Sequence, residues 1–486
     1  MVRDKNAVKI NTADNVAVAL ETLQTGEICF GVALKEIIPA GHKFALSDIK
    51  KSEPIIKYGS PIGYATEGIA LGEHVHSHNL RTSLGAIEAY EYNPGAKNAS
   101  NGAQTKTFMG YKRKNGSVGI RNEVWVINTV GCVNKIAEKI VQKSADNVFT
   151  FVHPYGCSQL GDDHEYTQKI LKGMVNHPNA AGVLVLGLGC ENNHIEEFQG
   201  VLGEWDSERV KFLNAQDVAD DVAAGVEIVH ALVEYAQTFA REEIPVGELV
   251  LGLKCGGSDG FSGITANPLV GRLSDIVINH GGSCILTEVP EMFGAETLLM
   301  NRCVDENVFA RSVSLINDFK EYFVRHGQEI YENPSPGNKE GGITTLEEKS
   351  LGCTQKGGTA EVVDVLDYGQ TVKKPGLNLL QGPGNDIVAV TNLMAAGAHI
   401  VLFTTGRGTP LGAPVPTIKI SSNSSLAMKK PNWIDFDAGV LLDGTSMDEL
   451  GEKFFEYVLN VASGELAKNE ENDYREISIF KDGVTL

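Results

Sequence analysis

Apolar positions along the chain follow two patterns, and the change between them divides the sequence. Residues 7–90 carry short apolar runs that lie close together and are separated by turn residues, as in GEICFGVALKEIIPAGHKFAL. Closely spaced runs of this kind predict short strands, with one helical stretch around residues 15–23. We therefore expect a small β-rich module over residues 1–92, followed by a polar linker at residues 93–107.

From residue 108 onward, apolar β-branched runs alternate with segments of helical period. The predicted strands lie at 124–128, 147–153, 181–189 and 210–215, and after a break at 241–248 at 249–257, 283–290, 360–366, 377–384 and 399–408. Strands that alternate with helices predict a mostly parallel sheet covered by helices. The fold class is therefore α/β, with the β-rich module followed by a large α/β region in two parts, 108–243 and 244–486.

Composition and charge argue against nucleic acid and membranes as partners. The 42 basic and 62 acidic side chains give a formal net charge of -20 and are spread along all 486 residues, so no cationic face is available for nucleic acid. No apolar run reaches the length of a membrane span, and the first residues lack the order of a signal peptide. We expect a cytoplasmic protein with no membrane or nucleic-acid partner, and the sequence leaves open whether it forms a homo-oligomer.

Four of the eight cysteines directly follow predicted strands, namely Cys132, Cys157, Cys190 and Cys255. Ligands of open α/β sheets bind at the carboxyl ends of strands, so these thiols are expected to converge at one sheet edge. Thiolates from separate loops suit an iron site or an iron–sulfur cluster better than structural zinc. The alternative interpretation is that each cysteine is a small buried packing residue.

The β-rich module contains a second group of metal-binding and titratable residues. His74, His76 and His78 alternate in GEHVHSHN, which on a strand places all three imidazoles on one face, as in a divalent-metal site or on an ordinary exposed strand. His42 and Lys43 follow a glycine in a predicted turn, where they suit an acid/base pair.

Glycine-rich loops after the later strands supply polar and cationic candidates. Ser258, Asp259 and Asn267 lie in KCGGSDGFSGITANP, Lys339 in SPGNKEGG and Arg407 in TTGRGTP. Successive amides with an added cation can hold a carboxylate or a phosphate, although ordinary solvated turns have the same composition. Neither loop matches a nucleotide-binding motif. The residues themselves thus indicate a metal-assisted enzyme acting on a small anionic substrate.

Long segments of the chain resemble the altronate and galactarate dehydratase family. The matching runs extend over nearly the whole chain and include GHKFAL, IKYGSPIGYA, GEHVHSHN, TVGCVN, YGCSQLGDDH, CGGSDGFSGITANP, NPSPGNKEGGITTLEEKSLGCTQK and TTGRGTP. The histidine-rich run and the GCTQK segment favour the altronate branch over the galactarate branch. The resemblance implies an amino-terminal SAF module with a β-clip fold, followed by a large dehydratase region.

The resemblance also implies an iron-dependent hydro-lyase that converts D-altronate to 2-dehydro-3-deoxy-D-gluconate and water in hexuronate (galacturonate) catabolism. Under it, the four strand-end cysteines bind a labile iron–sulfur cluster, or else His74 and His76 bind a single Fe(II). His42 and Lys43 become the acid/base residues, and Lys339 and Arg407 bind the carboxylate. The remaining hypotheses are a galactarate dehydratase, a non-catalytic sugar-acid or metal sensor, and a phosphate-binding transferase.

Overall fold

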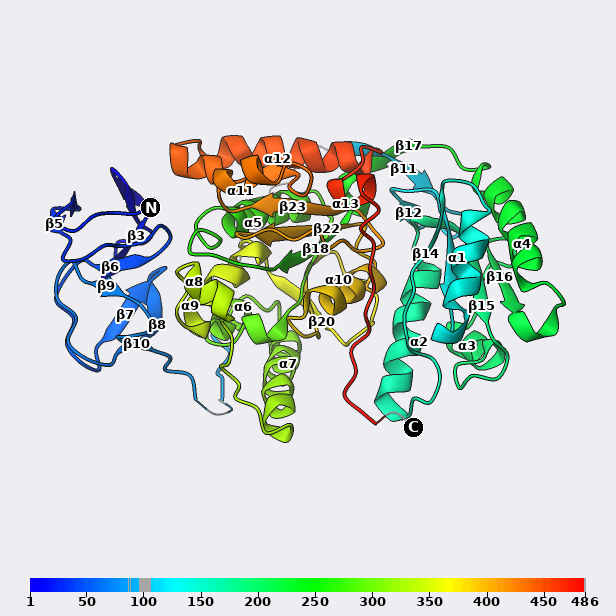
Figure 1. The fold of residues 1–486 in the computed structure, drawn as a ribbon, viewed down its shortest axis with the longest axis horizontal. Helices are drawn as coiled ribbons and strands as arrows, with labels where there is room; N and C mark the ends of the chain where they lie inside the picture. The colour runs from blue at the N-terminus through cyan, green and yellow to red at the C-terminus, as the bar shows by residue number, and fades with distance from the viewer. Residues whose placement is uncertain (86, 88, 96–105, 485–486) are drawn as a thin grey trace.

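The computed structural model describes residues 1–85, 87, 89–95 and 106–484. Figure 1 shows three bodies in a row, with the N-terminal module at one end, the C-terminal domain in the centre and the second domain at the other end. The expected class is confirmed, because a β-rich module precedes two parallel sheets covered by helices. Most of the predicted linker, 93–107, lies outside the described residues.

Short antiparallel strands build the N-terminal module. One sheet has the order β1-β2-β3-β6-β9, a second the order β10-β8-β7, and β4 pairs with β5. Their bounds are β1 (Val2–Asp4), β2 (Ala7–Lys9), β3 (Val16–Ala19), β4 (Ile28–Cys29), β5 (Val32–Ala33), β6 (Lys43–Ala45), β7 (Pro54–Lys57), β8 (Ser60–Ala65), β9 (His74–Val75) and β10 (Leu80–Arg81). The helix predicted around 15–23 is wrong, since β3 lies there, buried between β2 and β6.

The second domain is a four-stranded parallel sheet of order β14-β13-β15-β16 with a helix after each strand. Its elements are β13 (Glu123–Asn128), α1 (Asn134–Gln142), β14 (Val148–Thr150), α2 (Gly161–Asn176), β15 (Ala180–Gly187), α3 (Ile195–Leu202), β16 (Val210–Asn214) and α4 (Asp221–Ala236). All residues of β13 and β15 are buried, as expected for strands covered by helices on both faces.

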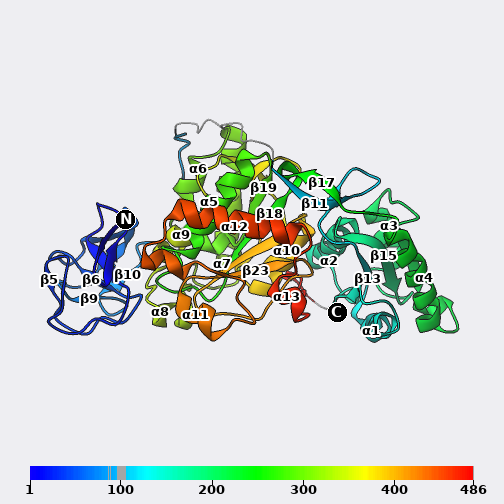
Figure 2. The same ribbon diagram turned by 90° about the horizontal axis from the view of Figure 1, so that it is seen from above.

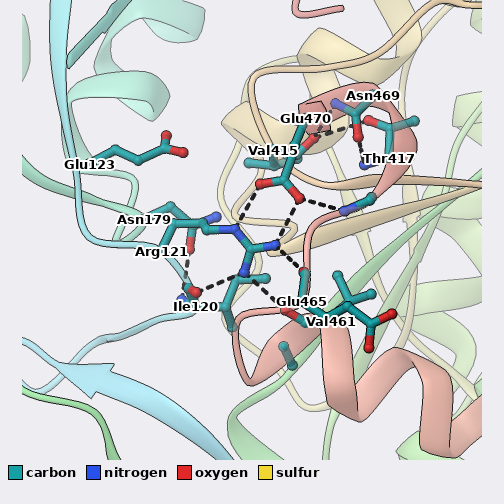
Figure 3. Close-up of polar contacts among 12 residues, drawn as sticks. Ile120, Arg121, Glu123, Asn179, Val415, Thr417, Val461, Glu465, Asn469 and Glu470 are labelled. Carbon is teal, nitrogen blue, oxygen red and sulfur yellow. Dashed lines mark hydrogen bonds and ion pairs between the residues drawn. The ribbon is translucent and has the colours of Figure 1, made fainter. Parts of the chain in front are cut away.

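A small antiparallel sheet joins the second domain to the rest of the chain. The entering strand β11 (Thr107–Lys112) lies between β12 (Val118–Gly119) and the leaving strand β17 (Glu242–Pro245). Beside this sheet, Arg121 forms a bidentate ion pair with Glu470, with Nε–Oε1 and Nη2–Oε2 distances of 2.7 and 2.8 Å (Figure 3). Arg121 also donates to the carbonyls of Val461 and Glu465. These buried contacts fix the second domain against the C-terminal domain.

The C-terminal domain contains a seven-stranded parallel sheet of order β20-β21-β19-β18-β22-β23-β24. The strands are β18 (Val250–Cys255), β19 (Ser283–Leu286), β20 (Val362–Leu366), β21 (Gly376–Leu380), β22 (Ile400–Thr405), β23 (Thr417–Ser421) and β24 (Phe436–Asp437). The helices are α5 (Ala266–Asn279), α6 (Glu296–Met300), α7 (Glu306–Arg325), α8 (Pro336–Glu340), α9 (Leu346–Cys353), α10 (Asp386–Ala395), α11 (Ser424–Lys429), α12 (Met447–Ala462) and α13 (Lys468–Glu471).

The largest apolar core lies in this domain. Figure 2 shows α12 running across it beside α5, and α12 buries Phe454, Phe455 and Val458 against the core. On the side facing the N-terminal module, Figure 1 shows α8 and α9 close to β8. No described helix combines the length and the apolar character needed to cross a membrane.

Candidate functional site

Four histidines gather where the N-terminal module meets the C-terminal domain. Strand β6 pairs with β9 so that Phe44 lies opposite His74, which brings His42, the residue before β6, close to the histidines of GEHVHSHN. The ring centroid of His42 lies 5.1 Å from that of His74 and 4.8 Å from that of His76. The ring centroids of His74 and His78 are 5.4 Å apart. The predicted histidine and lysine candidates of the module therefore share one site.

Hydrogen bonds assign the proton positions of His42 and His74. Nε2 of His42 lies 3.1 Å from the carbonyl oxygen of Glu340, and a carbonyl only accepts, so this nitrogen carries the proton. Nδ1 of neutral His42 then accepts from Nε2 of His74 at 3.0 Å. Neutral His74 consequently keeps its lone pair on Nδ1, where it can accept a proton.

A buried ion-pair network supports the same interface from the other side. Nζ of Lys43 donates to Gly342 O at 3.0 Å and to Thr344 Oγ1 at 2.7 Å, and it lies 2.9 Å from Glu348 Oε2. Nζ of Lys57 donates to the other oxygen of Glu348 at 2.8 Å. All three protons of the Lys43 ammonium group are used in this arrangement, so Lys43 is held in place and supports Thr344.

Thr344 joins Lys43 to His76. Its hydroxyl oxygen accepts from Lys43 at 2.7 Å and lies 2.9 Å from Nδ1 of His76. With the hydroxyl proton donated to that nitrogen, neutral His76 carries its proton on Nε2. The cluster thus presents one imidazole with a free lone pair, His74, and one with an N–H donor, His76, which is the pairing that general acid–base chemistry requires.

Burial keeps these side chains in defined charge states. Burial and the neighbouring imidazoles lower the pKa of His74 to about 3, while burial and Lys43 lower that of His76 to about 4. Burial lowers the pKa of Lys43 to about 8. For Glu348, burial acts in the opposite direction, but Lys43 and Lys57 outweigh it and lower the pKa to about 2. The histidines are therefore neutral near pH 7.

The lowered histidine pKa values predict how stability depends on pH. The unfolded chain protonates His74 and His76 near pH 6.5, whereas the folded chain does so only near pH 3 to 4. Their contribution is complete above pH 6.5 and is lost as the pH falls toward 4. We expect the urea midpoint to fall across this window and to fall less in H74Q/H76Q. Replacing the exposed His230 by Gln is the control, and an unchanged pH profile in H74Q/H76Q would contradict the assignment.

A pocket of about 540 Å³ lies beside the histidines, between the module and the C-terminal domain. The module contributes Ser77 and Arg81 to its wall, and the C-terminal domain contributes Lys339 and Thr344. Thr344 is the residue that binds His76, so the pocket and the histidine cluster share a wall. The lining also contains the carboxylates of Glu329 and Glu332, so Arg81 and Lys339 are the two groups of the wall that suit the carboxylate of a small substrate.

The other predicted loop residues occupy supporting positions. Nη1 of Arg407 lies 3.0 Å from Glu340 Oε2 and donates to Gly337 O at 3.2 Å, so it holds helix α8. Buried Asp259 accepts hydrogen bonds from the hydroxyls of Ser262 and Ser422 and from Asn423.

Asn267 and Ser258 are also buried in the C-terminal domain. Asn267 accepts from Thr404 and donates to Gly352 O. The carbonyl of Ser258 accepts from Asn338, while its buried hydroxyl has no hydrogen-bond partner in the structure. Like Arg407 and Asp259, these two residues are not part of the lining described for the pocket.

The structure separates Cys255 from the other three predicted cysteines. Cys132, Cys157 and Cys190 are exposed in the second domain, whereas Cys255 is buried in the C-terminal domain. Its Sγ lies 3.3 Å from the Sγ of Cys353 and 2.8 Å from Glu291 Oε2. Convergence at a sheet edge holds only for strands of one sheet, and β18 belongs to a different sheet from β13, β14 and β15.

Cys255, Glu291 and Cys353 form a buried set of metal-ligating atoms that sequence reasoning did not assemble. One ligand atom from each residue lies within 4.8 Å of the others, and it is the only such group among the described residues. The signals were present, since Glu291 follows strand β19 in TEVPEMFG and Cys353 lies in GCTQK. Lys349 connects this set to the pocket wall, because its Nζ lies 2.8 Å from Glu291 and donates to Asn333.

Comparison with known proteins identifies the family. Models of the altronate/galactarate dehydratase SAF domain, of the D-galactarate dehydratase/altronate hydrolase second domain and of the D-galactarate/altronate dehydratase C-terminal domain match residues 5–83, 110–237 and 246–485. The altronate dehydratase of Bacillus subtilis (strain 168) is 53% identical over 496 residues, covering 99% of this chain and 100% of the relative. The chain belongs to the altronate/galactarate dehydratase family.

Two further relatives of this dehydratase family come from Escherichia coli (strain K12). Its altronate dehydratase is 54% identical over 492 residues, covering 99% of each chain. Its galactarate dehydratase (L-threo-forming) is 33% identical over 497 residues, covering 94% of this chain and 92% of the relative. The family resemblance deduced from the sequence motifs is confirmed, and the pocket beside the histidines is lined by residues from the parts matched by the SAF and C-terminal models.

Proposed function

We propose that this chain dehydrates D-altronate to 2-dehydro-3-deoxy-D-gluconate and water in the pocket between the module and the C-terminal domain, as a step of hexuronate catabolism. Sequence identity supports D-altronate as the substrate. The chain is 53% and 54% identical to two altronate dehydratases over 99% of its length, but 33% identical to a galactarate dehydratase. The pocket supports this substrate with Arg81 and Lys339 in its wall, and it shares Thr344 with the cluster that contains His74 and His76.

The reaction removes the C2 proton of the aldonate, expels the C3 hydroxyl as water and yields an enol that tautomerises to the ketone. We assign removal of the C2 proton to Nδ1 of His74, whose lone pair is fixed by the hydrogen bond to His42. The Nε2–H of His76 protonates the departing hydroxyl, while the Lys43 ammonium group returns a proton to Nδ1 of His76 through the Thr344 hydroxyl, so that His76 stays neutral and Lys43 becomes the neutral amine. An anionic substrate next to the imidazoles raises their pKa and so strengthens His74 as a base.

The remaining predicted residues bind the substrate or position the catalytic side chains. Lys339, with Arg81 of the module, binds the substrate carboxylate in the pocket. His42 orients His74, and Lys43 orients His76 through Thr344. Arg407 is a positioning residue, since it pairs with Glu340 on the helix that carries Lys339. These local cations act against the overall charge of -20, which by itself repels an anionic substrate.

We propose that the enzyme uses iron and that the buried set of Cys255, Glu291 and Cys353 holds it. Two thiolates and a carboxylate suit a divalent transition metal, and replacing two thiol protons by one divalent ion leaves the local charge unchanged among the neighbouring lysines. Bound iron would stabilise negative charge that develops on the substrate. Lys349 links this set to the pocket wall by contacting both Glu291 and Asn333.

Metal content tests the assignment of the ligands. We expect C353S and E291Q, purified anaerobically, to contain less iron per chain than the unchanged chain, whereas C284S, which alters another buried cysteine, retains it. H74Q/H76Q tests the alternative in which these two histidines hold a single Fe(II). Loss of iron from H74Q/H76Q together with full retention in C353S would overturn the assignment to the cysteines.

Product formation tests the function itself. The full chain, purified anaerobically and supplied with iron, is incubated separately with D-altronate and with galactarate, and the 2-keto acid is measured. We expect rapid formation of the keto acid from D-altronate and slower turnover of galactarate. Binding of D-altronate without product would favour a sugar-acid sensor, and preference for galactarate would reassign the substrate; either result contradicts the proposal.

A further inference from the structure

The wall of the pocket beside the histidines carries charges of both signs. Arg81 of the module and Lys339 of helix α8 are its cations, and Glu329 and Glu332 are its carboxylates. None of these four side chains forms an ion pair with another residue that the structure describes. All four charges can therefore act on a molecule that enters the pocket.

The two cations keep hydrogen-bond donors for a ligand. Nη1 of Arg81 donates to the uncharged main-chain carbonyls of Ser77 and Leu80, which leaves its Nε and Nη2 without a partner among the described residues. Lys339 lies on α8, whose first turn is fixed by a capping box, and its ammonium group likewise has no partner in the described part of the chain. A guanidinium and an ammonium group together suit a carboxylate.

The two carboxylates lie on one anchored segment, residues 326–335, which joins α7 to α8. Near its start, Gln328 N donates to Phe323 O at 2.9 Å. Near its end, Oδ1 of Asn333 accepts from Nζ of Lys349 at 3.2 Å, and Lys349 is buried. Both glutamates lie between these two contacts, so the backbone that carries them is held against the C-terminal domain.

The cations and the carboxylates of the wall do not neutralise one another. Since no ion pair joins them, each cation lies beyond ion-pair distance of each carboxylate. Separated charges of opposite sign distinguish the two ends of a chain molecule. The cations attract a carboxylate, whereas ionised glutamates only accept hydrogen bonds, which hydroxyl groups donate. One part of the wall therefore suits an anionic end, and the other part suits a hydroxylated end.

The two sugar acids named for the relatives of this chain, altronate and galactarate, differ at one end. D-altronate carries one carboxylate, at C1, and a primary hydroxyl at C6, whereas galactarate carries a carboxylate at each end. With one carboxylate bound by Arg81 and Lys339, the second carboxylate of galactarate would meet Glu329 and Glu332, and like charges repel. Specific recognition often includes such a repulsive group against the wrong ligand.

We propose that Glu329 and Glu332 determine the specificity of this enzyme for an aldonate over an aldarate. They repel a second carboxylate and accept hydrogen bonds from the hydroxyls at the far end of the aldonate. The inference rests on the proposed function, because it uses the same substrate and the same pocket. Both glutamates are exposed, so water weakens the repulsion, and we expect them to contribute a discrimination of about tenfold.

Turnover of the two acids by the full chain supplied with iron provides the first test. In E329Q/E332Q the ratio of kcat/KM for galactarate to kcat/KM for D-altronate should rise by about tenfold. The matched control is E234Q/E321Q, which removes two exposed carboxylates that are not part of the described pocket lining and should leave the ratio unchanged. An equal ratio in the two double variants would overturn the proposal, as would an equal loss of both activities in E329Q/E332Q.

Binding measured without turnover separates this inference from the proposed function. Isothermal titration calorimetry of H74Q, which lacks the proposed base, gives the Kd of D-altronate and of galactarate. Adding E329Q/E332Q to this chain should lower the ratio of the galactarate Kd to the altronate Kd by about tenfold. An unchanged Kd ratio, or binding of neither acid, would overturn the inference. A lowered ratio together with no keto acid from the unchanged chain would support the inference and contradict only the proposed function.

Discussion

Replacing His74 by glutamine is expected to lower kcat for D-altronate by about 10²- to 10⁴-fold, the range that a positioned general base contributes. A glutamine amide can still donate to Nδ1 of His42, as Nε2 of His74 does at 3.0 Å, but it cannot accept the C2 proton. The substrate carboxylate still meets Lys339 and Arg81 in the pocket, so KM should change much less than kcat.

The neighbouring His78 provides the matched control for this prediction. Its ring centroid lies 5.4 Å from that of His74, and no step of the proposed reaction uses it. Steady-state measurement of keto acid formation should therefore place H78Q close to the unchanged chain. A kcat for H74Q within a few-fold of H78Q would show that His74 is not the base.

Replacing Glu348 by glutamine is expected to destabilise the protein by about 3–5 kcal/mol, the range for removing one partner of a buried ion pair. Glu348 contacts both Lys43 and Lys57, and all three side chains are at most 1% exposed. The substitution keeps the size of the side chain but leaves two buried ammonium groups without a counter-charge.

Urea unfolding followed by circular dichroism measures this effect, with linear extrapolation to water. The control is E73Q, which breaks the exposed pair of Lys35 and Glu73, with side chains 50% and 34% exposed, and should cost less than about 1 kcal/mol. Equal losses in the two variants would contradict the buried network. E348Q should also lower turnover, because Lys43 supports Thr344 and through it His76.

The sequence predicts the α/β architecture well because its strands are continuous apolar runs. Strand β15 corresponds to the run predicted at 181–189, and β22 to that at 399–408. Strand β23, with the sequence TIKIS, is fully buried although apolar and polar residues alternate in it, and none of the predicted strands covers it. Mixed apolar and polar residues also explain why a helix was wrongly predicted at residues 15–23. The strand found there, β3, is buried because β2 and β6 pair with it from other parts of the chain.

Only the part of the candidate site that belongs to the N-terminal module was predictable from the sequence. His42, Lys43, His74 and His76 are recognisable from their types and spacing, but their partners lie far along the chain. Thr344 is 268 residues from His76, and Gly342 is 299 residues from Lys43, so no local pattern pairs them. The same applies to Cys255 and Cys353, which meet across 98 residues because helix α9 returns to the end of β18.

The most direct test of the account is exchange of the C2 hydrogen of D-altronate with D₂O, followed by NMR together with product formation. In the proposed reaction His74 removes the proton and His76 protonates the leaving hydroxyl. H76Q should therefore still exchange the C2 hydrogen while forming little product, and H74Q should show neither exchange nor product. Exchange in H74Q at the rate of the unchanged chain would contradict the assignment of His74 as the base.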